Sequence, residues 1–120
     1  MSKIVLITGA SSGIGKTIAI FLTNKGFKVY GTCRNPKKYN ISEFSLLKCN
    51  INSKDEIEDT INFIIDKENK IDILINNAGK LINKPFKNIS RDDLYSVFDV
   101  NVFGVFNLIQ KLLPFFIKEA

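Results

Sequence analysis

The sequence predicts an α/β protein built on a parallel sheet, and three observations lead to that fold class. Short apolar or β-branched runs alternate with longer segments of helical periodicity along the chain. Two of the runs, residues 4–7 and 71–75, are apolar almost throughout, as in strands that helices cover on both faces. A glycine-rich bend joins the first run to the first helical segment. Strands that alternate with helices imply right-handed crossovers and a Rossmann-like, doubly wound sheet.

Four strands are expected, and the first helix follows the first of them. The strands are those at residues 4–7, 28–32, 44–49 and 71–75. The first helix carries apolar residues at helical spacing: Ile14, Ile18, Phe21 and Leu22. We expect this stripe to pack on the sheet, and Gly26 supplies the signal that ends the helix.

Two further helices begin at hydroxyl residues. Ser53 with Glu56, and Ser90 with Asp93, have the spacing of a capping box. Residues 35–38 predict a turn or a short helical start. The third helix carries a mostly apolar stripe of Leu94, Phe98, Asn101, Val105, Leu108 and Leu112. An amide on a face that should be buried needs hydrogen-bond partners, because burying it unpaired costs a few kcal/mol.

Composition sets the class of protein. The 120 residues predict one domain, residues 1–120, and the hydrophobic share of 45% is enough for a packed core. Disordered and collagen-like proteins are therefore excluded. The 17 Lys and Arg outnumber the 12 Asp and Glu, but they are scattered singly, so we expect no nucleic-acid partner. The chain has no His, so we expect no His-ligated metal site and assign no metal ligands.

The cysteines and the apolar segments point to the cytoplasm. Cys33 and Cys49 lack a C-x-x-C spacing and are expected to be reduced thiols. The apolar stretch at residues 97–117 is interrupted by polar residues and Pro114, so we expect a buried helix and no membrane partner.

The glycine-rich bend indicates nucleotide binding. Residues 8–17 leave the first strand with three glycines and enter a helix directly. Glycines let the backbone turn tightly and approach a diphosphate, whose charge the helix N-terminus stabilises.

A phosphate-binding loop of the NTPase type is one alternative for this bend. Residues 10–17 fit a relaxed A-x-x-x-x-G-K-T pattern, with Lys16 and Thr17 as the phosphate and magnesium ligands. The strict motif has Gly at the position of Ala10. The fourth strand is followed by Asn76, where an NTPase needs a carboxylate for Mg²⁺.

The other alternative is a dinucleotide fold, which three ordered motifs support. Residues 8–15 read Thr-Gly-x-x-x-Gly-Ile-Gly, residues 76–79 read Asn-Asn-Ala-Gly, and Asn101 lies in the third helix. Together they resemble the short-chain dehydrogenase/reductase family over nearly the whole chain. The resemblance implies an NAD(P)-dependent oxidoreductase that transfers hydride between nicotinamide and a carbonyl or alcohol substrate.

The resemblance assigns roles to individual residues. It implies cofactor contacts for Gly9, Ser11, Ser12, Gly13, Ile14, Gly15, Asn77, Ala78 and Gly79. Asn50 and Ile51 stand where the family has an Asp and an apolar residue at the adenine, and an Asn still accepts through its carbonyl oxygen. Asn76 is expected to tie the fourth strand to neighbouring backbone. Asn101 is implied in the catalytic set, bending its helix and holding a water that relays protons.

The end of the second strand indicates NADP(H), with NAD possible. NAD-binding folds commonly have a carboxylate about 20 residues beyond the glycines, and here residues 31–35 hold none. Arg34 in that stretch would accommodate a 2′-phosphate instead.

The residues that the resemblance implies for proton transfer, a Tyr followed four residues later by a Lys, have no match in this sequence. No Tyr is followed four residues later by Lys, and the expected sheet has four strands in the order 3-2-1-4, where such folds have about six. We therefore expect the N-terminal half of an oxidoreductase, inactive alone and homo-oligomeric when complete. A non-catalytic nucleotide-binding module stays open as an alternative. The last helix carries apolar residues around its circumference: Phe98, Phe103, Phe106, Leu113, Phe115, Phe116 and Ile117.

Overall fold

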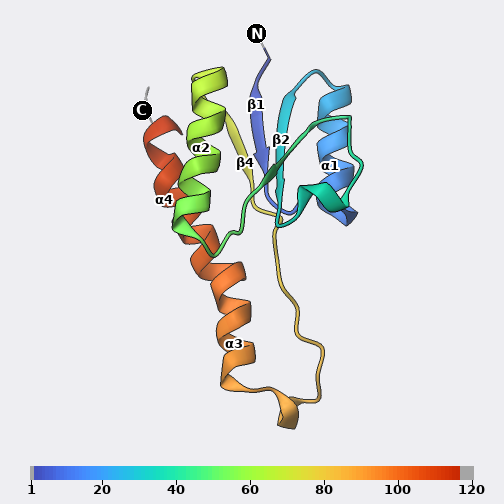
Figure 1. Ribbon diagram of the computed structural model, residues 1–120, viewed down its shortest axis with the longest axis vertical. Helices are drawn as coiled ribbons and strands as arrows, with labels where there is room; N and C mark the ends of the chain where they lie inside the picture. Colours follow the sequence, from blue (N-terminus) through green and yellow to red (C-terminus); the bar gives the residue numbers. More distant parts are fainter. Residues whose placement is uncertain (1, 117–120) are drawn as a thin grey trace.

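A computed structural model describes residues 2–116 and shows one parallel sheet with helices on both faces (Figure 1). In chain order the elements are β1 (Ile4–Ile7), α1 (Gly13–Asn24), β2 (Lys28–Cys33), the 3₁₀ turn η1 (Pro36–Lys38), β3 (Ser45–Lys48), α2 (Lys54–Glu68), β4 (Ile73–Ile75), the 3₁₀ turn η2 (Phe86–Asn88), α3 (Arg91–Phe98), a π-helical segment η3 (Asp99–Gly104) and α4 (Val105–Phe116). The strands lie in the order β3-β2-β1-β4, and every pair is parallel. The predicted fold class and strand order are confirmed.

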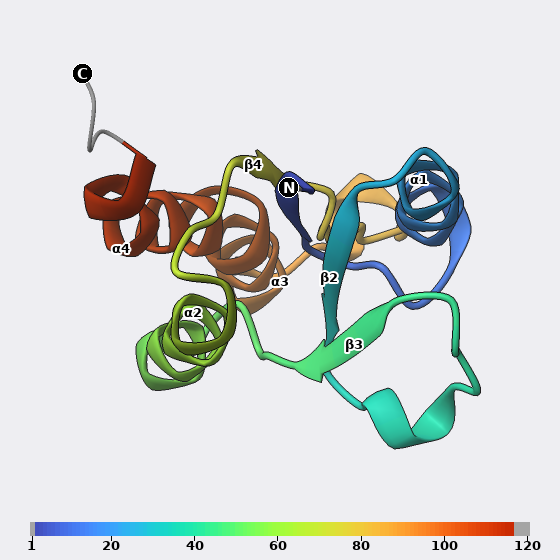
Figure 2. The same cartoon turned by 90° about the horizontal axis from the view of Figure 1, so that it is seen from above.

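The sheet lies between α1 on one face and α2 and α4 on the other (Figure 2), and a hydrophobic core fills each side. Successive side chains of a strand point to opposite faces. Leu6 of β1 therefore joins the core beneath α2 and α4, with Ile57 and Leu112. Its neighbour Val5 joins the core beneath α1, with Ala19. Both faces of β1 are buried, which explains its unbroken apolar sequence.

The face of α1 that packs on the sheet matches the predicted stripe only in part. Ile14 and Phe21 are 73% and 58% exposed, whereas Gly15 and Ala19 are buried. A Cβ atom on Gly15 would collide with the carbonyl oxygen of Gly9. The start of the helix approaches the loop so closely that a side chain at residue 15 would collide with it. Of the predicted stripe, Ile18 and Leu22 pack against the core on this face, whereas Ile14 and Phe21 lie outward.

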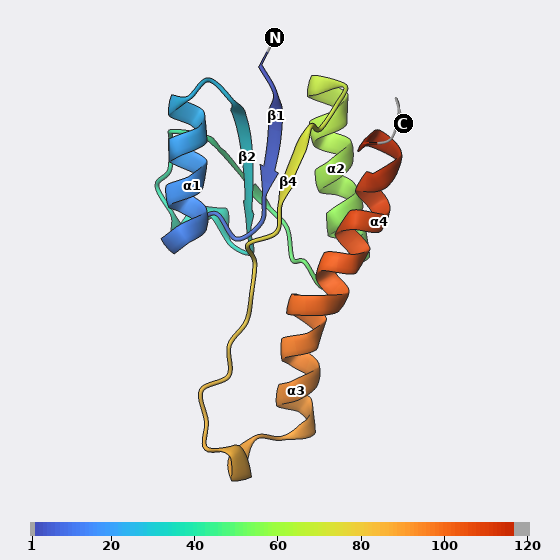
Figure 3. The same ribbon diagram turned by 180° about the vertical axis from the view of Figure 1, so that it is seen from behind.

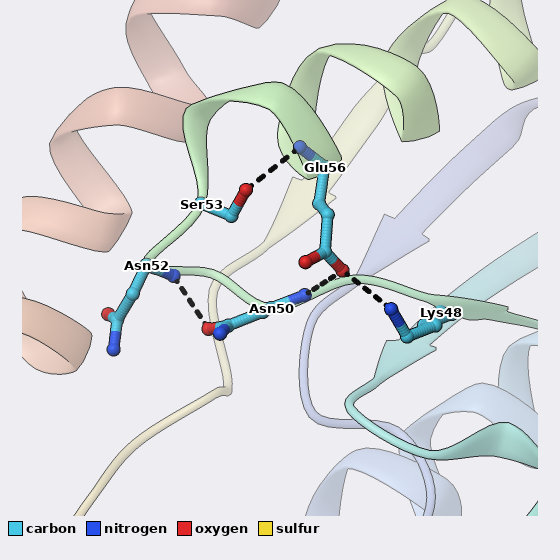
Figure 4. A network of polar contacts seen from close by, with 5 residues as sticks. All are labelled: Lys48, Asn50, Asn52, Ser53 and Glu56. Carbon is cyan, nitrogen blue, oxygen red and sulfur yellow. Dashed lines mark hydrogen bonds and ion pairs between the residues drawn. The ribbon is translucent and has the colours of Figure 1, made fainter.

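The start of α2 forms only half of the predicted capping box (Figure 4). The Ser53 hydroxyl accepts from the Glu56 N–H at 3.2 Å. The Glu56 carboxylate, however, accepts from the Asn50 N–H at 3.1 Å and from Lys48 Nζ at 3.4 Å. Glu56 thus ties the end of β3 to α2. The box at Ser90 is complete, as predicted.

The last helix is less buried than the sequence predicts. The helix Arg91–Phe116 is continuous, and its first part projects below the sheet together with the connection from β4 (Figures 1 and 3). The radius of gyration is 15.1 Å, against about 13.6 Å for a compact domain of this length. Within residues 91–116 the buried side is short, comprising Val100, Gly104, Leu108 and Leu112. Ile117 lies outside the described residues.

This helix is also long and apolar enough to cross a membrane, judged by length and composition alone. Core helices of soluble proteins meet the same two conditions, so the observation carries little weight by itself.

Candidate functional site

A cleft of about 480 Å³ opens at the carboxyl ends of the strands. Ligands of doubly wound folds bind at this edge, where helices leave the strands toward opposite faces. The residues that line the cleft are Gly9, Ser11, Ser12, Thr32, Cys33, Arg34, Cys49, Ile51, Asn77, Ala78, Gly79, Lys80 and Val100. They come from the ends of all four strands and from the π-helical segment.

The glycine loop between β1 and α1 forms the floor of the cleft. Gly9 has a φ of +66°, and a Cβ atom there would lie 2.9 Å from the Ala78 Cα. At Gly13, with a φ of +58°, a Cβ atom would meet nothing within 4 Å. Ser12 makes no side-chain cap hydrogen bond, and the first turn of α1 holds no acidic residue. The N-terminus of α1 thus has neither a side-chain cap nor an acidic residue in its first turn, and uncapped N–H groups at a helix N-terminus favour anions.

The β4 exit is tied to the glycine loop by hydrogen bonds. The Thr8 hydroxyl accepts from the N–H groups of Asn77 at 3.0 Å and Ala78 at 2.9 Å. The Asn77 side chain donates to the Gly9 carbonyl oxygen at 2.9 Å. The prediction that Asn76 makes this tie is wrong, because its neighbour Asn77 makes it.

Asn101 clamps the chain just beyond β4. Its Oδ1 atom accepts from the Lys80 N–H at 2.8 Å, and its Nδ2 atom donates to the Lys80 carbonyl oxygen at 2.9 Å. Asn101 lies within the π-helical segment, where the helix departs from α geometry. Its residue surface is exposed, against the expectation of burial, but its amide has the partners that the sequence required.

The π-helical segment also closes on the loop after β3. A Cβ atom on Gly104 would lie 2.8 Å from the Ile51 Cγ1 atom. Glycine at this position lets the helix come close to Ile51, which with Val100 lines the cleft.

The far side of the cleft is formed where β2 and β3 end. Arg34 is exposed at the cleft, directly after Cys33. Burial raises the pKa of the Cys33 thiol, and burial likewise raises that of Cys49. Both cysteines are free in the structure. Among the residues that line the cleft, Arg34 and Lys80 carry positive charge and none is a carboxylate.

Some predicted site residues lie away from the lining. These are Gly13, Ile14, Gly15, Asn50 and Asn101. The Oδ1 atom of Asn50, expected at the adenine, accepts from the Asn52 N–H at 3.0 Å (Figure 4). Gly15 and Asn101 do not line the cleft but hold residues that do. Gly15 packs against Gly9, and Asn101 is hydrogen-bonded to the Lys80 backbone.

Five lining residues were missed by the sequence analysis: Thr32, Cys33, Cys49, Lys80 and Val100. Three of them, Thr32, Cys33 and Cys49, stand at or just beyond the ends of predicted strands, and Lys80 directly follows the motif at residues 76–79. Their position at the carboxyl edge of a parallel sheet was the signal that could have found them.

The residues of the alternative phosphate-loop motif do not meet at the cleft. Lys16 and Thr17 line a separate surface depression, together with Gly13, Ile14, Ile18 and Ile20. The Thr17 hydroxyl donates to the Gly13 carbonyl oxygen at 3.1 Å, within the helix. Within residues 2–116 no three His, Cys, Asp or Glu side chains gather as metal ligands.

Comparisons with known proteins agree with this geometry. The model of a family described as short chain dehydrogenase matches residues 3–120. The 3-ketodihydrosphingosine reductase of Bacteroides thetaiotaomicron is 35% identical over 116 residues, which cover 97% of this chain and 43% of the reductase. The NADPH-dependent pterin aldehyde reductase of Arabidopsis thaliana is 36% identical over 123 residues, covering 94% of this chain and 50% of that protein.

A solved structure gives the same result for the fold. The ligand-free aldohexose dehydrogenase of Thermoplasma acidophilum superposes with a TM-score of 0.90 at 27% identity, over 99% of this chain and 46% of the dehydrogenase. The chain thus spans about half the length of the curated relatives that it matches.

Proposed function

The chain belongs to the short-chain dehydrogenase family, and from that premise we propose that it is the cofactor-binding half of an NADP(H)-dependent oxidoreductase. The domain so proposed comprises residues 1–120. The reaction would transfer hydride between the nicotinamide and a small carbonyl or alcohol substrate.

The observation that carries the choice of cofactor is the charge at the end of β2. Arg34 lies at the cleft, no carboxylate lines it, and none of the ion pairs within residues 2–116 involves Arg34. A carboxylate here would accept from a ribose 2′-hydroxyl, whereas a guanidinium matches a 2′-phosphate. The Arabidopsis relative is described as NADPH-dependent, which agrees with this preference.

The residues present fit a dinucleotide along the whole cleft. Ser11 and Ser12, which line the cleft, and the uncapped first N–H groups of α1 would hold the diphosphate. Arg34 and Ile51 would hold the adenosine end. The bound cofactor supplies the hydride chemistry, and the protein supplies binding and orientation.

The role proposed for Asn101 is to keep the β4 exit in position. Its two hydrogen bonds fix the Lys80 backbone at the end of the cleft that lies next to β4. The Tyr-x-x-x-Lys pair that the resemblance implies for proton transfer has no match in these 120 residues. We therefore propose that turnover needs residues beyond them and that cofactor binding is this chain's own contribution.

A fluorescence titration tests the proposal against its alternatives. We expect NADPH to bind more tightly than NADH and Mg-ATP to leave the protein unchanged. Equal or tighter binding of NADH would contradict the cofactor preference. Release of phosphate from ATP in the presence of Mg²⁺ would favour the NTPase, for which Lys16 and Thr17 are the candidate ligands.

A further inference from the structure

Lys80 is a charged residue of the cleft that the proposed function leaves without a role. It is the first residue after Gly79, it lines the cleft and it is exposed. None of the ion pairs within residues 2–116 involves it, whereas nearby Lys84 pairs with Asp93 at 2.8 Å. The ammonium group of Lys80 is thus uncompensated within the described chain.

The backbone that carries this ammonium is fixed. Asn101 holds both the N–H and the carbonyl oxygen of Lys80, at 2.8 and 2.9 Å. Because the backbone of Lys80 is held, its ammonium group can move only as far as the side chain extends from that point. Lys80 lines the cleft, and the cleft lining includes no carboxylate that could neutralise the lysine's charge.

Lys80 and Arg34 lie on opposite sides of the glycine loop. The strand order places β2 on one side of β1 and β4 on the other. Arg34 follows β2 and Lys80 follows β4. If Arg34 holds the 2′-phosphate and the loop holds the diphosphate, the reactive end of the dinucleotide lies on the β4 side. The charge of Lys80 then faces the region where the substrate meets the cofactor.

We propose that Lys80 binds an anionic group of the substrate, so that the site takes carbonyl or alcohol compounds bearing a carboxylate or a phosphate. This inference rests on the proposed function and narrows its substrate class. A charge-assisted hydrogen bond from an ammonium to such a group favours the anion over an uncharged analogue of similar shape.

The test measures binding to the 120-residue chain without relying on turnover. The ¹⁵N-labelled protein is first titrated with NADP⁺ and then with 3-oxobutanoate or 4-oxopentanoate, each compared with its methyl ester. The amide shifts of Gly79, Lys80 and Asn101 report binding. Lys80→Met removes the charge, and Lys87→Met is the matched control because Lys87 is exposed on the same connection but lies outside the cleft lining.

We expect at least one of the acids to bind about fivefold more tightly than its ester at low salt, a modest value because the site is open to water. Lys80→Met should abolish the difference and leave the NADP⁺ affinity within about twofold, while Lys87→Met should change neither. The proposal is overturned if acids and esters bind alike or not at all, or if Lys87→Met has the same effect. A loss of NADP⁺ affinity in Lys80→Met with an unchanged acid preference also overturns it, since Lys80 would then contact the cofactor.

Failure of the proposed function has a different signature. If NADP⁺ shifts no amide of the unmodified chain, the cofactor proposal fails. The acids and esters are then compared on the cofactor-free protein. A preference for the acid that disappears in Lys80→Met supports the anion site, and no preference overturns it.

Discussion

Arg34 decides the cofactor preference at the scale of a single residue. It stands directly after β2 and brings a guanidinium to a cleft lined by no carboxylate. Arg34→Asp replaces that donor by a charge that repels a 2′-phosphate. We expect NADPH affinity to fall about 10- to 100-fold, because a hydrogen bond to a charged group contributes about 1.5–3 kcal/mol. The measurement is a fluorescence titration with both reduced cofactors, and NADH binding should be unchanged or improved.

Lys37→Asp provides the control for this substitution. Lys37 is exposed in η1, three residues beyond Arg34, and is not among the residues that line the cleft. The control makes the same change of net charge, so an equal loss of NADPH affinity would show that long-range charge, and not a contact at Arg34, sets the preference.

Neighbouring asparagines show how far sequence reasoning reaches at this scale. The motif at residues 76–79 marked the β4 exit correctly, but the tie to Gly9 comes from Asn77 and not from Asn76. Successive residues at a strand end point in opposite directions, and a shift of one residue exchanges their partners. Local sequence does not show which amide faces the glycine loop. Nor does local sequence show that the side-chain oxygen of Asn50 accepts from the Asn52 N–H, within the turn that Asn50 begins.

At the scale of elements, Asn101 joins the π-helical segment to the β4 exit. Asn101→Leu removes both hydrogen bonds to the Lys80 backbone. We expect faster hydrogen exchange at the Lys80 N–H, with nearly unchanged cofactor binding. In an enzyme that contains both halves, turnover should be lost. Exchange is measured by NMR, and turnover by NADPH oxidation.

Gln110→Leu is the matched control. Gln110 is exposed in α4, which follows the π-helical segment, and it makes no side-chain hydrogen bond within the described residues. If Asn101→Leu leaves exchange at Lys80 no faster than Gln110→Leu does, the clamp does not hold the connection. If the complete enzyme keeps most of its rate, Asn101 is only a satisfied amide.

The start of α2 predicts a pH dependence of stability. The Asn50 N–H and the Lys48 ammonium hold the pKa of the Glu56 carboxyl below its ordinary value. A carboxylate with a lowered pKa in the folded state stabilises the fold above its unfolded pKa of about 4.3, and this stabilisation is lost as pH falls through the folded pKa. Glu56→Gln should therefore lower the urea midpoint at pH 7 and leave it nearly unchanged at about pH 3.

Asp59→Asn serves as the control for that experiment. Asp59 is exposed on the same helix, and no side-chain hydrogen bond involves it within residues 2–116. A Glu56→Gln variant whose urea midpoint follows pH in parallel with the unmodified protein would show that the carboxylate contributes nothing to acid stability.

Elements were easier to predict than the faces that they bury. The strands and helices followed from periodicity and capping residues, and their boundaries differ by a few residues at most. Only part of the stripe on α1 faces the sheet, since Ile18 and Leu22 pack against the core while Ile14 and Phe21 are exposed. Gly15 and Ala19 are the fully buried residues and let the helix approach Gly9 and the sheet. Periodicity shows where large residues lie on a helix, but the distance of approach decides which side faces inward.

For the whole molecule, the alternation of strands and helices was enough to predict the sheet. Right-handed crossovers leave few ways to order four parallel strands, and the expected order is the one found. The cleft followed from the same rule, since it lies at the carboxyl edge. The projection of α3 and its connection could not be predicted, because composition does not show what an apolar helix packs against.

The projecting region leaves the whole molecule with an unusual apolar surface. Large side chains exposed on this region and on α4, which follows it, are Leu81, Phe86, Leu94, Tyr95, Phe98, Val102, Phe103, Phe106, Ile109 and Leu113. Leu81 and Phe86 are 86% and 92% exposed. Strand β4 is an edge strand of the sheet, paired only with β1 within the described residues. Unpaired strand edges favour association between chains. Large exposed apolar patches on soluble proteins favour contact with other chains.

We predict that the 120-residue chain self-associates or binds a hydrophobic dye such as ANS. Each large apolar side chain left in water forgoes about 1.5–3 kcal/mol, and several together rival the net stability of a domain, about 5–15 kcal/mol. Replacing Phe103 and Phe106 by Lys should reduce both association and dye binding, measured by light scattering and ANS fluorescence. Phe21→Lys, on the opposite layer, removes an equally exposed aromatic and should change neither. A monodisperse monomer that binds no ANS would contradict the prediction, because the exposed helix would then cost the fold nothing measurable.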